Sequence, residues 1–564
     1  MPKNPRQLAA DAARAAILAA YEQAVVTGAL PAGAPGQFDV SEPREKGRGD
    51  LASNFAMVWA KPLGLPPHKI AEAVAGELDL SGTVAAAEVA GPGFVNLRLS
   101  ADWYADTLLA IEQAGDDYGK SEGGRGRKVQ VEYVSANPTG PMHLGNARGG
   151  VLGDTLSTIL EWTGCDVTRE FYLNDAGNQV DLLGRTMQAR YFELLGDPDR
   201  YPMPEDGYHG EDVIENARRY LELYGDKLAE ADEGARVAEL RDFALEQNIA
   251  RMKADLARYR IRHDVFFPES SLYETGAVEQ TLDRLDKNGA LYEQDGALWF
   301  AASRYGVEKD DVLRKSNGFY TYYAADIAYH HNKFVTRGFD EVIDIFGADH
   351  HGHSIRFKAG MAALGIDPER LRFVLIQFVR LLRDGEVVRM SKRTGKAVSL
   401  ADLLDEIPVD AARFFFCSRQ NDTAMDFDLD LAVKQENDNP VYYVQYAHAR
   451  ICSILRNLAA EGVTPRPADS LDLRLLVAEE ERDLIRHLGD FPQQLILAAR
   501  DLDPSRLTKY VSEAASLFHR FYTACHVRGE QEALMQARLK LCQLTGQVLR
   551  NTLGILKVTC PERM

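Results

Sequence analysis

The stretch VQVEYVSANPTGPMHLGNARGG, residues 129–150, decides the fold of this 564-residue chain. Its first six residues are rich in β-branched and aromatic side chains, which predicts a strand. A loop with Pro138, Gly140 and Pro141 follows, and from Leu144 onward apolar residues recur at helical spacing. The stretch therefore predicts a strand, a loop and a helix, which is the first half of a β-α-β unit.

Three further runs read as strands, at residues 166–175, 341–349 and 371–379. Strands that alternate with helices favour a parallel sheet flanked by helices. Ligands on such sheets bind outside the carboxyl ends of the strands. We therefore expect the chemistry of a multidomain α/β chain to lie at that edge of a parallel-sheet catalytic domain.

The regions around this sheet have a different character. An Ala-rich amphipathic helix at residues 8–26, a Gly/Pro-rich loop at 28–49 and a strand near 89–100 predict an α+β N-terminal module. Strand signals stop near residue 430, and helical periodicity then predicts an all-α C-terminal bundle. The resulting division is an N-terminal module at 1–120, a catalytic domain with insertions at 121–400, a connecting segment at 401–432 and a helical domain at 433–564.

Composition excludes several classes of protein. The net charge is −19, which argues against indiscriminate nucleic-acid binding, although residues 505–564 hold nine basic and four acidic residues and form a local basic region. The sequence contains no run of about 18 apolar residues, so it predicts no membrane span. The six cysteines include no C-x-x-C pair, which argues against a disulfide framework or a thiolate zinc site and favours a reducing cytoplasm.

Residues 135–150 are suited to bind the phosphate groups of a nucleotide. The stretch has neither a Walker nor a dinucleotide fingerprint, but a helix N-terminus attracts anions, His143 adds a ring donor, and Gly145 leaves room for a nucleotide. The alternative, that His143 is a helix-start residue packed into the core, carries equal weight at this point.

A second basic signal lies in LLRDGEVVRMSKRTGKAVSL, residues 381–400. It predicts a strand, a D-G turn at Asp384 and Gly385, and a loop crowded with Arg389, Lys392 and neighbouring cations. Such a loop is suited to neutralise charge on a departing pyrophosphate. A solvated basic turn is the commoner meaning of a charge run alone.

Together, HLGN and RMSKR resemble the HIGH and KMSKS signatures of class I aminoacyl-tRNA synthetases. With YYAADIAYH (322–330) and GADHHGH (347–353), essentially the whole chain resembles the bacterial arginyl-tRNA synthetase family. The resemblance implies a Rossmann-like catalytic domain and an arginine–tRNA ligase that joins L-arginine to tRNA through an arginyl-adenylate, with transfer to the 2′-hydroxyl of the terminal adenosine. It also implies ATP as substrate, Mg²⁺ but no zinc, tRNA bound before activation, and a cytoplasmic monomer that does not engage membranes.

The resemblance also assigns site residues. Glu132, Tyr322 and Asp326 would hold the guanidinium, whose planar fork of donors matches a carboxylate. Without the family resemblance, Glu132 would be interpreted as an ordinary salt-bridge partner and Asp326 as a charge on the surface of a helix. Further residues would meet the α-amino and carboxylate groups of arginine (Ser135, Asn137, Asp349, His350) or ATP (His143, Gly145, Asn146, Met390, Ser391, Lys392), with His143, Asn146 and Lys392 as the catalytic set.

Two positions depart from the signatures. Asn146 replaces the second histidine of HIGH and cannot become cationic, and Arg389 replaces the first lysine of KMSKS, so Lys392 is expected to stabilise the transition state. In the C-terminal region, Arg520, Tyr522, His526 and Arg528 would bind tRNA, although Tyr522 reads equally well as core. The histidines near 330 and 350 lack the partners of a zinc motif.

Two other functions fit part of the pattern. A small-molecule nucleotidyltransferase also places a histidine-bearing helix start under ATP, but it has no use for a basic helical tail. A non-catalytic tRNA-binding paralogue would be expected to lose the pocket or the loop lysine, and both are present. The cysteinyl enzyme of the same class is disfavoured because its zinc-ligand cysteines are missing.

Overall fold

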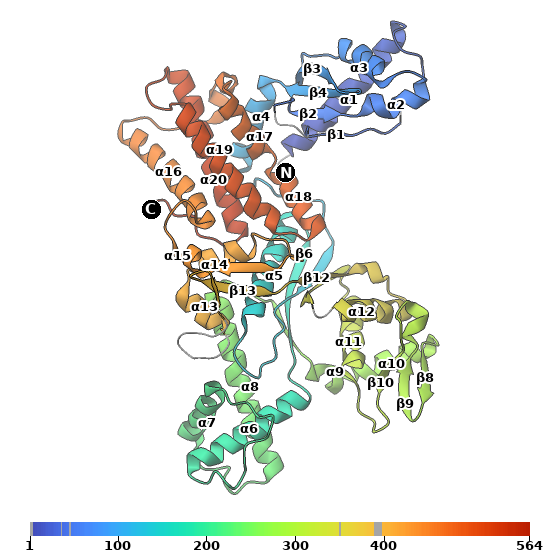
Figure 1. Ribbon diagram of the computed structural model, residues 1–564, viewed down its shortest axis with the longest axis vertical. Coiled ribbons are helices and arrows are strands. Elements are labelled where there is room, and N and C mark those ends of the chain that lie inside the picture. Colours follow the sequence, from blue (N-terminus) through green and yellow to red (C-terminus); the bar gives the residue numbers. More distant parts are fainter. Residues whose placement is uncertain (1–3, 35, 44–46, 349–350, 389–397) are drawn as a thin grey trace.

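The computed structural model describes residues 4–34, 36–43, 47–348, 351–388 and 398–564 (Figure 1). It consists of an α+β N-terminal module, a parallel sheet flanked by helices, and a C-terminal helical bundle, so the predicted fold class is confirmed. The N-terminal module (blue) lies beside the bundle (orange and red), and helices α6–α8 project from the opposite end of the molecule. No helix in these described ranges is long and apolar enough to cross a membrane.

The N-terminal module packs helices on a four-stranded antiparallel sheet of order β1-β2-β4-β3. The single strand expected near 89–100 is instead the β3–β4 hairpin, and a Cβ at Gly93 (φ 138°) in its turn would lie 2.7 Å from Pro67 Cβ, so only glycine fits there. The elements are α1 (Pro5–Val26), β1 (Val40–Ser41), β2 (Leu51–Ser53), α2 (Phe55–Leu63), α3 (Pro67–Gly76), β3 (Val84–Ala90), β4 (Phe94–Leu99) and α4 (Ala101–Ala114).

The central sheet has the strand order β12-β11-β5-β6-β7, and every neighbouring pair is parallel. From β5 the chain passes outward through β6 to β7 and then returns to β11 and β12 on the other side. Such a reversal opens a crevice at the carboxyl ends of the two strands that flank it, here β5 and β11. The elements are β5 (Lys128–Glu132), α5 (Leu144–Trp162), β6 (Asp166–Leu173), β7 (Val265–Pro268), β11 (Glu341–Gly347), α12 (His351–Ala363) and β12 (Leu371–Ile376).

Two insertions interrupt the sheet: the first has its own apolar cluster, and the second shares a cluster with β11, α12 and β12. The first projects between β6 and β7, and the second carries a small antiparallel sheet of order β10-β9-β8. Their elements are α6 (Asn178–Leu195), α7 (Glu211–Tyr224) and α8 (Glu233–Arg258), then α9 (Ser270–Glu274), α10 (Ala277–Lys287), β8 (Leu291–Gln294), β9 (Ala297–Phe300), β10 (Asp311–Arg314) and α11 (Tyr322–His331).

The predicted D-G turn joins β13 (Val379–Arg383) to β14 (Glu386–Val388). Asp384 and Gly385 both have positive φ, 52° and 78°, as a two-residue hairpin turn requires. β13 also pairs in parallel with β15 (Met425–Asp428). The short helices around β15 are α13 (Leu400–Glu406), α14 (Val409–Phe416) and α15 (Leu429–Val433).

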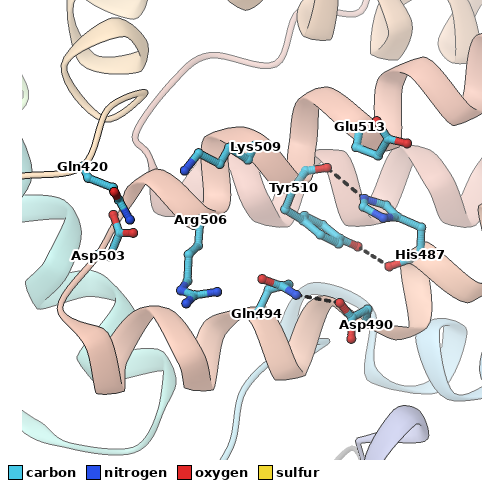
Figure 2. A pocket seen from close by; sticks show the side chains of 9 residues that line it. All are labelled: Gln420, His487, Asp490, Gln494, Asp503, Arg506, Lys509, Tyr510 and Glu513. Atoms are coloured by element: carbon cyan, nitrogen blue, oxygen red, sulfur yellow. Dashed lines mark hydrogen bonds between the residues drawn. The ribbon is translucent and has the colours of Figure 1, made fainter. Parts of the chain in front are cut away.

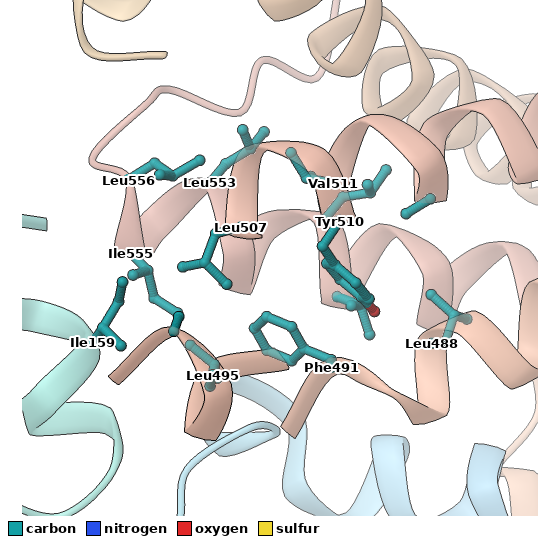
Figure 3. Packing of buried hydrophobic residues seen from close by; sticks show 14 of the residues in the cluster. Ile159, Leu488, Phe491, Leu495, Leu507, Tyr510, Val511, Leu553, Ile555 and Leu556 are labelled. Atoms are coloured by element: carbon teal, nitrogen blue, oxygen red, sulfur yellow. The ribbon is translucent and has the colours of Figure 1, made fainter. Parts of the chain in front are cut away.

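The C-terminal bundle is joined to the catalytic sheet through α5. Figure 3 shows Ile159 of α5 in one apolar cluster with Leu495 and Ile555 of the bundle. On the same helix, the buried carboxylate of Asp154 forms ion pairs with Arg413 at 2.7 Å and with Lys557 at 2.6 Å. The bundle helices are α16 (Pro440–Ala460), α17 (Glu479–Gly489), α18 (Phe491–Asp501), α19 (Ser505–Ala524) and α20 (Glu532–Ile555).

Candidate active site

The predicted site residues gather at the carboxyl end of the central sheet. β5 ends at Glu132, and the chain then turns sharply through Val134 and Ser135, whose φ values are 73° and 40°. This turn leads into the loop that ends at His143, the N-cap of α5. The geometry therefore brings the end of β5 and the start of α5 to the same edge.

The N-terminus of α5 is open to solvent. His143 and Gly145 are exposed, and a Cβ at Gly145 would meet nothing within 4 Å. Asn146 has local partners: its Oδ1 accepts from the His143 N–H at 3.0 Å, and its Nδ2 donates to the Val134 carbonyl at 3.3 Å. The structure thus leaves His143 and the free N–H groups of the helix facing outward, while Asn146 holds the turn.

Residues 389–397 of the second basic motif lie outside the described residues, and they include Arg389, Met390, Ser391 and Lys392; Asp349 and His350 also lie outside them. The chain that follows it is described. Ser399 forms a β-bridge with His143, and the Leu400 N–H donates to the Met142 carbonyl at 2.9 Å. The end of the second motif is therefore anchored directly beside the start of the first.

Asp326 and Tyr322 lie one turn apart at the start of α11, as the spacing predicts. Tyr322 is 60% exposed, and a Cβ at Gly177 would lie 3.6 Å from its hydroxyl. The Asp326 carboxylate has no hydrogen bond or ion pair to any other described residue. Burial, with a smaller contribution from Glu269, raises the pKa of Asp326 to about 7. A cation bound at this carboxylate would offset that penalty.

Glu132 is buried and already paired. Its Oε2 accepts from Lys333 Nζ at 2.6 Å, and its Oε1 accepts from the Ser135 hydroxyl at 2.9 Å. The hydroxyl of Ser135 in turn accepts from the Tyr172 N–H at 3.2 Å. Asn137 is exposed and donates to Gln179 at 2.7 Å. Of the carboxylates assigned to the guanidinium, Asp326 is the one without a cationic partner in the described chain.

Sequence reasoning missed Lys333 and Glu269. Lys333 comes seven residues after Asp326, about two helical turns further on, and its side chain is fully buried. Glu269 directly follows β7, so it lies at the carboxyl edge of the sheet; it accepts from the Tyr273 hydroxyl at 3.1 Å, and burial raises its pKa. The position of Glu269 after a strand is a signal that the sequence offers, whereas Glu132, one of the two carboxylate partners of Lys333, lies 201 residues away in the chain.

Comparisons with known proteins agree with this geometry. Three family descriptions match in order: "Arginyl tRNA synthetase N terminal domain" at residues 11–99, "tRNA synthetases class I (R), catalytic domain" at 109–435, and "DALR anticodon binding domain" at 444–564. The arginine–tRNA ligase of Caldanaerobacter subterraneus subsp. tengcongensis is 52% identical over 563 residues, covering 100% of both chains. The chain belongs to the arginyl-tRNA synthetase family.

Another arginine–tRNA ligase, from Acetivibrio thermocellus, is 50% identical and covers 96% of both chains. The arginyl-tRNA synthetase of Thermus thermophilus superposes with a TM-score of 0.73 over 97% of this chain and 99% of its own, at 24% identity. At that identity the superposition shows a shared fold. The class I catalytic fold of the chain therefore has both sequence and structural support.

The residues predicted to bind tRNA lie at the end of α19 and just beyond it. His526 is exposed, and Arg520 and Arg528 are exposed cations near Glu513 and Glu461, at 3.6 Å and 2.9 Å. Tyr522 is half-buried: it packs against the apolar cluster, with the Arg450 guanidinium 4.8 Å from its ring centre. Both readings of Tyr522 therefore keep a structural basis.

One further pocket involves none of the predicted site residues. It has a volume of about 370 Å³ and lies beside α17, α18 and α19 (Figure 2), where His487 and Tyr510 bond to each other and Gln494 bonds to Asp490. Among the histidines near residue 330, His330 is bonded to Asp344 and His331 lies 3.2 Å from Arg284. The described ranges contain no group of three metal-ligating side chains.

Proposed function

We propose that the chain attaches L-arginine to its tRNA in two steps. The arginine carboxylate attacks the α-phosphate of ATP, pyrophosphate leaves, and the 2′-hydroxyl of the terminal adenosine of tRNA then takes the arginyl group. The observation that carries the proposal is the partly buried carboxylate of Asp326, which has no ion pair with any described residue and lies at the same sheet edge as the exposed N-terminus of α5. One is suited to a guanidinium and the other to a triphosphate.

In this proposal Asp326 takes the guanidinium, Tyr322 flanks it, and Ser135 and Asn137 lie toward the α-amino and carboxylate end together with Asp349 and His350. Glu132 lies beside the same arginine site, where its carboxylate is paired with Lys333. The chemistry needs no protein nucleophile, because the substrate carboxylate attacks. The task of the chain is to orient the two substrates and to stabilise charge.

ATP would lie over Gly145, with its phosphates near His143, Asn146 and the helix N-terminus. Met390, Ser391 and Lys392 would approach from the second motif, whose far end is anchored at His143 through Ser399. Mg²⁺ commonly binds through substrate phosphates and only one or two carboxylates, so the lack of a dedicated cage among the described residues is compatible with it. When bound, the ion would neutralise charge on the phosphates.

We also propose the division into a tRNA-contacting N-terminal module at 1–120, a Rossmann-like catalytic domain with insertions at 121–400, a connection at 401–432 and a helical anticodon-binding domain at 433–564. The three family matches support a division of this order. Arg520, Tyr522, His526 and Arg528 would contact tRNA, by phosphate pairing and by stacking on unpaired bases. The family resemblance further supports a cytoplasmic monomer.

The test is ATP–pyrophosphate exchange with each of the twenty amino acids, with and without total tRNA. Exchange with arginine that requires tRNA is the expected result. Exchange with a different amino acid would keep the class of enzyme and overturn the arginine site. No exchange under any condition would favour the non-catalytic paralogue.

A further inference from the structure

Lys333 is a fully buried lysine at the arginine edge of the sheet. Its ammonium donates to Glu132 Oε2 at 2.6 Å and to Asp344 Oδ1 at 2.8 Å, and it lies 4.2 Å from the centre of the Tyr329 ring. These contacts join the end of β5 to β11, the two strands that flank the crevice. A buried ammonium is retained only where such partners compensate its lost hydration.

The backbone is adapted to place this side chain. Directly after α11 the chain makes one π-helical turn, Asn332–Thr336, which contains Lys333. A π-turn inserts an extra residue and changes the direction of the side chains that follow, and such turns are frequent at functional sites. Here the turn follows the helix that carries Asp326, so Lys333 and Asp326 are positioned by the same segment.

Lys333 is the central member of a continuous chain of hydrogen bonds. On one side, Glu132 accepts from the Ser135 hydroxyl. On the other side, Asp344 Oδ2 lies 2.7 Å from His330 Nε2, and His330 Nδ1 lies 2.7 Å from the backbone carbonyl of Asp326. The chain therefore links three residues that the family resemblance assigns to arginine.

The carboxylates along this chain have partners. The Lys333 ammonium lies between the carboxylates of Glu132 and Asp344, and His330 Nε2 lies 2.7 Å from the second oxygen of Asp344. Nearby Glu170 is paired with Arg337. Asp326 is left as a carboxylate whose charge calls for an external cation.

We propose that Lys333 is a positioning residue that makes Asp326, and not Glu132, the anion for the substrate guanidinium. Because Lys333 donates to Glu132 Oε2, that carboxylate does not compete with Asp326 for the guanidinium. The same contact fixes the position of Glu132 Oε1, which accepts the hydrogen bond from the Ser135 hydroxyl. This inference rests on the proposed function, because it assigns a role within the same arginine site.

The experiment replaces Lys333 with methionine, which keeps the length of the aliphatic stem and removes the charge. Glu132 then becomes an unpaired anion that competes for the guanidinium. In tRNA-supported ATP–pyrophosphate exchange, we expect the KM for arginine to rise about tenfold or more, while the KM for ATP stays within about twofold. Lys333→Arg, which keeps a cation near Glu132, should recover part of the loss.

Folding is controlled in two ways. The double variant Lys333→Met, Asp344→Asn removes one charge of each sign and guards against loss of the fold, and its KM for arginine should still be raised. The matched control is Lys540→Met, which removes another buried lysine, one that pairs with Glu112 in the bundle. This control should lower the thermal midpoint and leave the KM for arginine unchanged.

A KM for arginine within twofold of wild type in either folded Lys333 variant overturns the inference. An equal rise in the Lys540→Met control overturns it as well, because the effect would then be general destabilisation. A failure of the proposed function is recognised separately, since the wild-type chain would then show no exchange with arginine.

Discussion

Replacing Asp326 with asparagine keeps the shape of the side chain and removes the charge proposed to bind arginine. Burial raises the pKa of this carboxyl to about 7 from an ordinary 3.8, so holding it ionised without a partner costs about 4 kcal/mol. A guanidinium at the carboxylate would offset part of that cost, and asparagine can still accept one hydrogen bond. We therefore expect a loss of about 2–4 kcal/mol, or roughly 30- to 1,000-fold in the KM for arginine.

The assay is ATP–pyrophosphate exchange with tRNA present, with arginine varied at saturating ATP and then the reverse. The effect should fall on the KM for arginine, with the KM for ATP nearly unchanged. Asp426→Asn serves as a matched control, because Asp426 is an exposed aspartate paired with Arg380 on β13. Equal arginine KM values in wild type and Asp326→Asn would place Asp326 outside the pocket and refute the reasoning.

Four further outcomes are expected. The kcat/KM for arginine should fall about tenfold per pH unit below about pH 7 and be flat above it, because only ionised Asp326 binds a cation; a profile that is unchanged in Asp326→Asn would contradict this assignment. Lys392→Ala should lower kcat for aminoacylation by about 10²-fold or more with near-normal tRNA affinity, and an unchanged rate would remove that loop from the mechanism. Arg413→Met leaves buried Asp154 without its closest buried cation and should destabilise the fold by about 3–5 kcal/mol, seen as a lower thermal midpoint by calorimetry. Filter binding should show that salt weakens tRNA binding steeply despite the net charge of −19, whereas a flat dependence would contradict local basic contacts.

The strands of the central sheet were predictable because each is a compact β-branched or apolar run between polar turns. Residues 166–175, 341–349 and 371–379 contain β6, β11 and β12 within a few positions. Insertions in the catalytic domain were expected, but the insertion α6–α8 was not placed, although Val213, Ala217 and Tyr220 of α7 recur at helical spacing and are buried. Helical periodicity alone does not indicate that a segment leaves the sheet and forms its own cluster.

The site divides in the same way between local and distant information. The helix start at His143 and the one-turn spacing of Tyr322 and Asp326 are local, and the structure has both. The pairing of Glu132 with Lys333 depends on β5 and the π-helical turn after α11 meeting in space across some two hundred residues. No spacing rule connects two such residues, so the sequence shows an available glutamate where the structure shows a paired one.

The departure at Asn146 illustrates how the structure changes the weight of a motif. From the signature alone, Asn146 only replaces a histidine with a residue that cannot carry a positive charge. In the fold, its amide accepts from the His143 N–H and donates to the Val134 carbonyl. A neutral imidazole also has one donor and one acceptor, but they lie on opposite sides of a rigid ring. Val134 and Ser135 have positive φ, so the bond from Asn146 stabilises a strained turn next to Glu132. Asn146 therefore couples the start of α5 to the end of β5, and positive charge for the phosphates falls to His143, the helix N-terminus and the basic residues of the second motif.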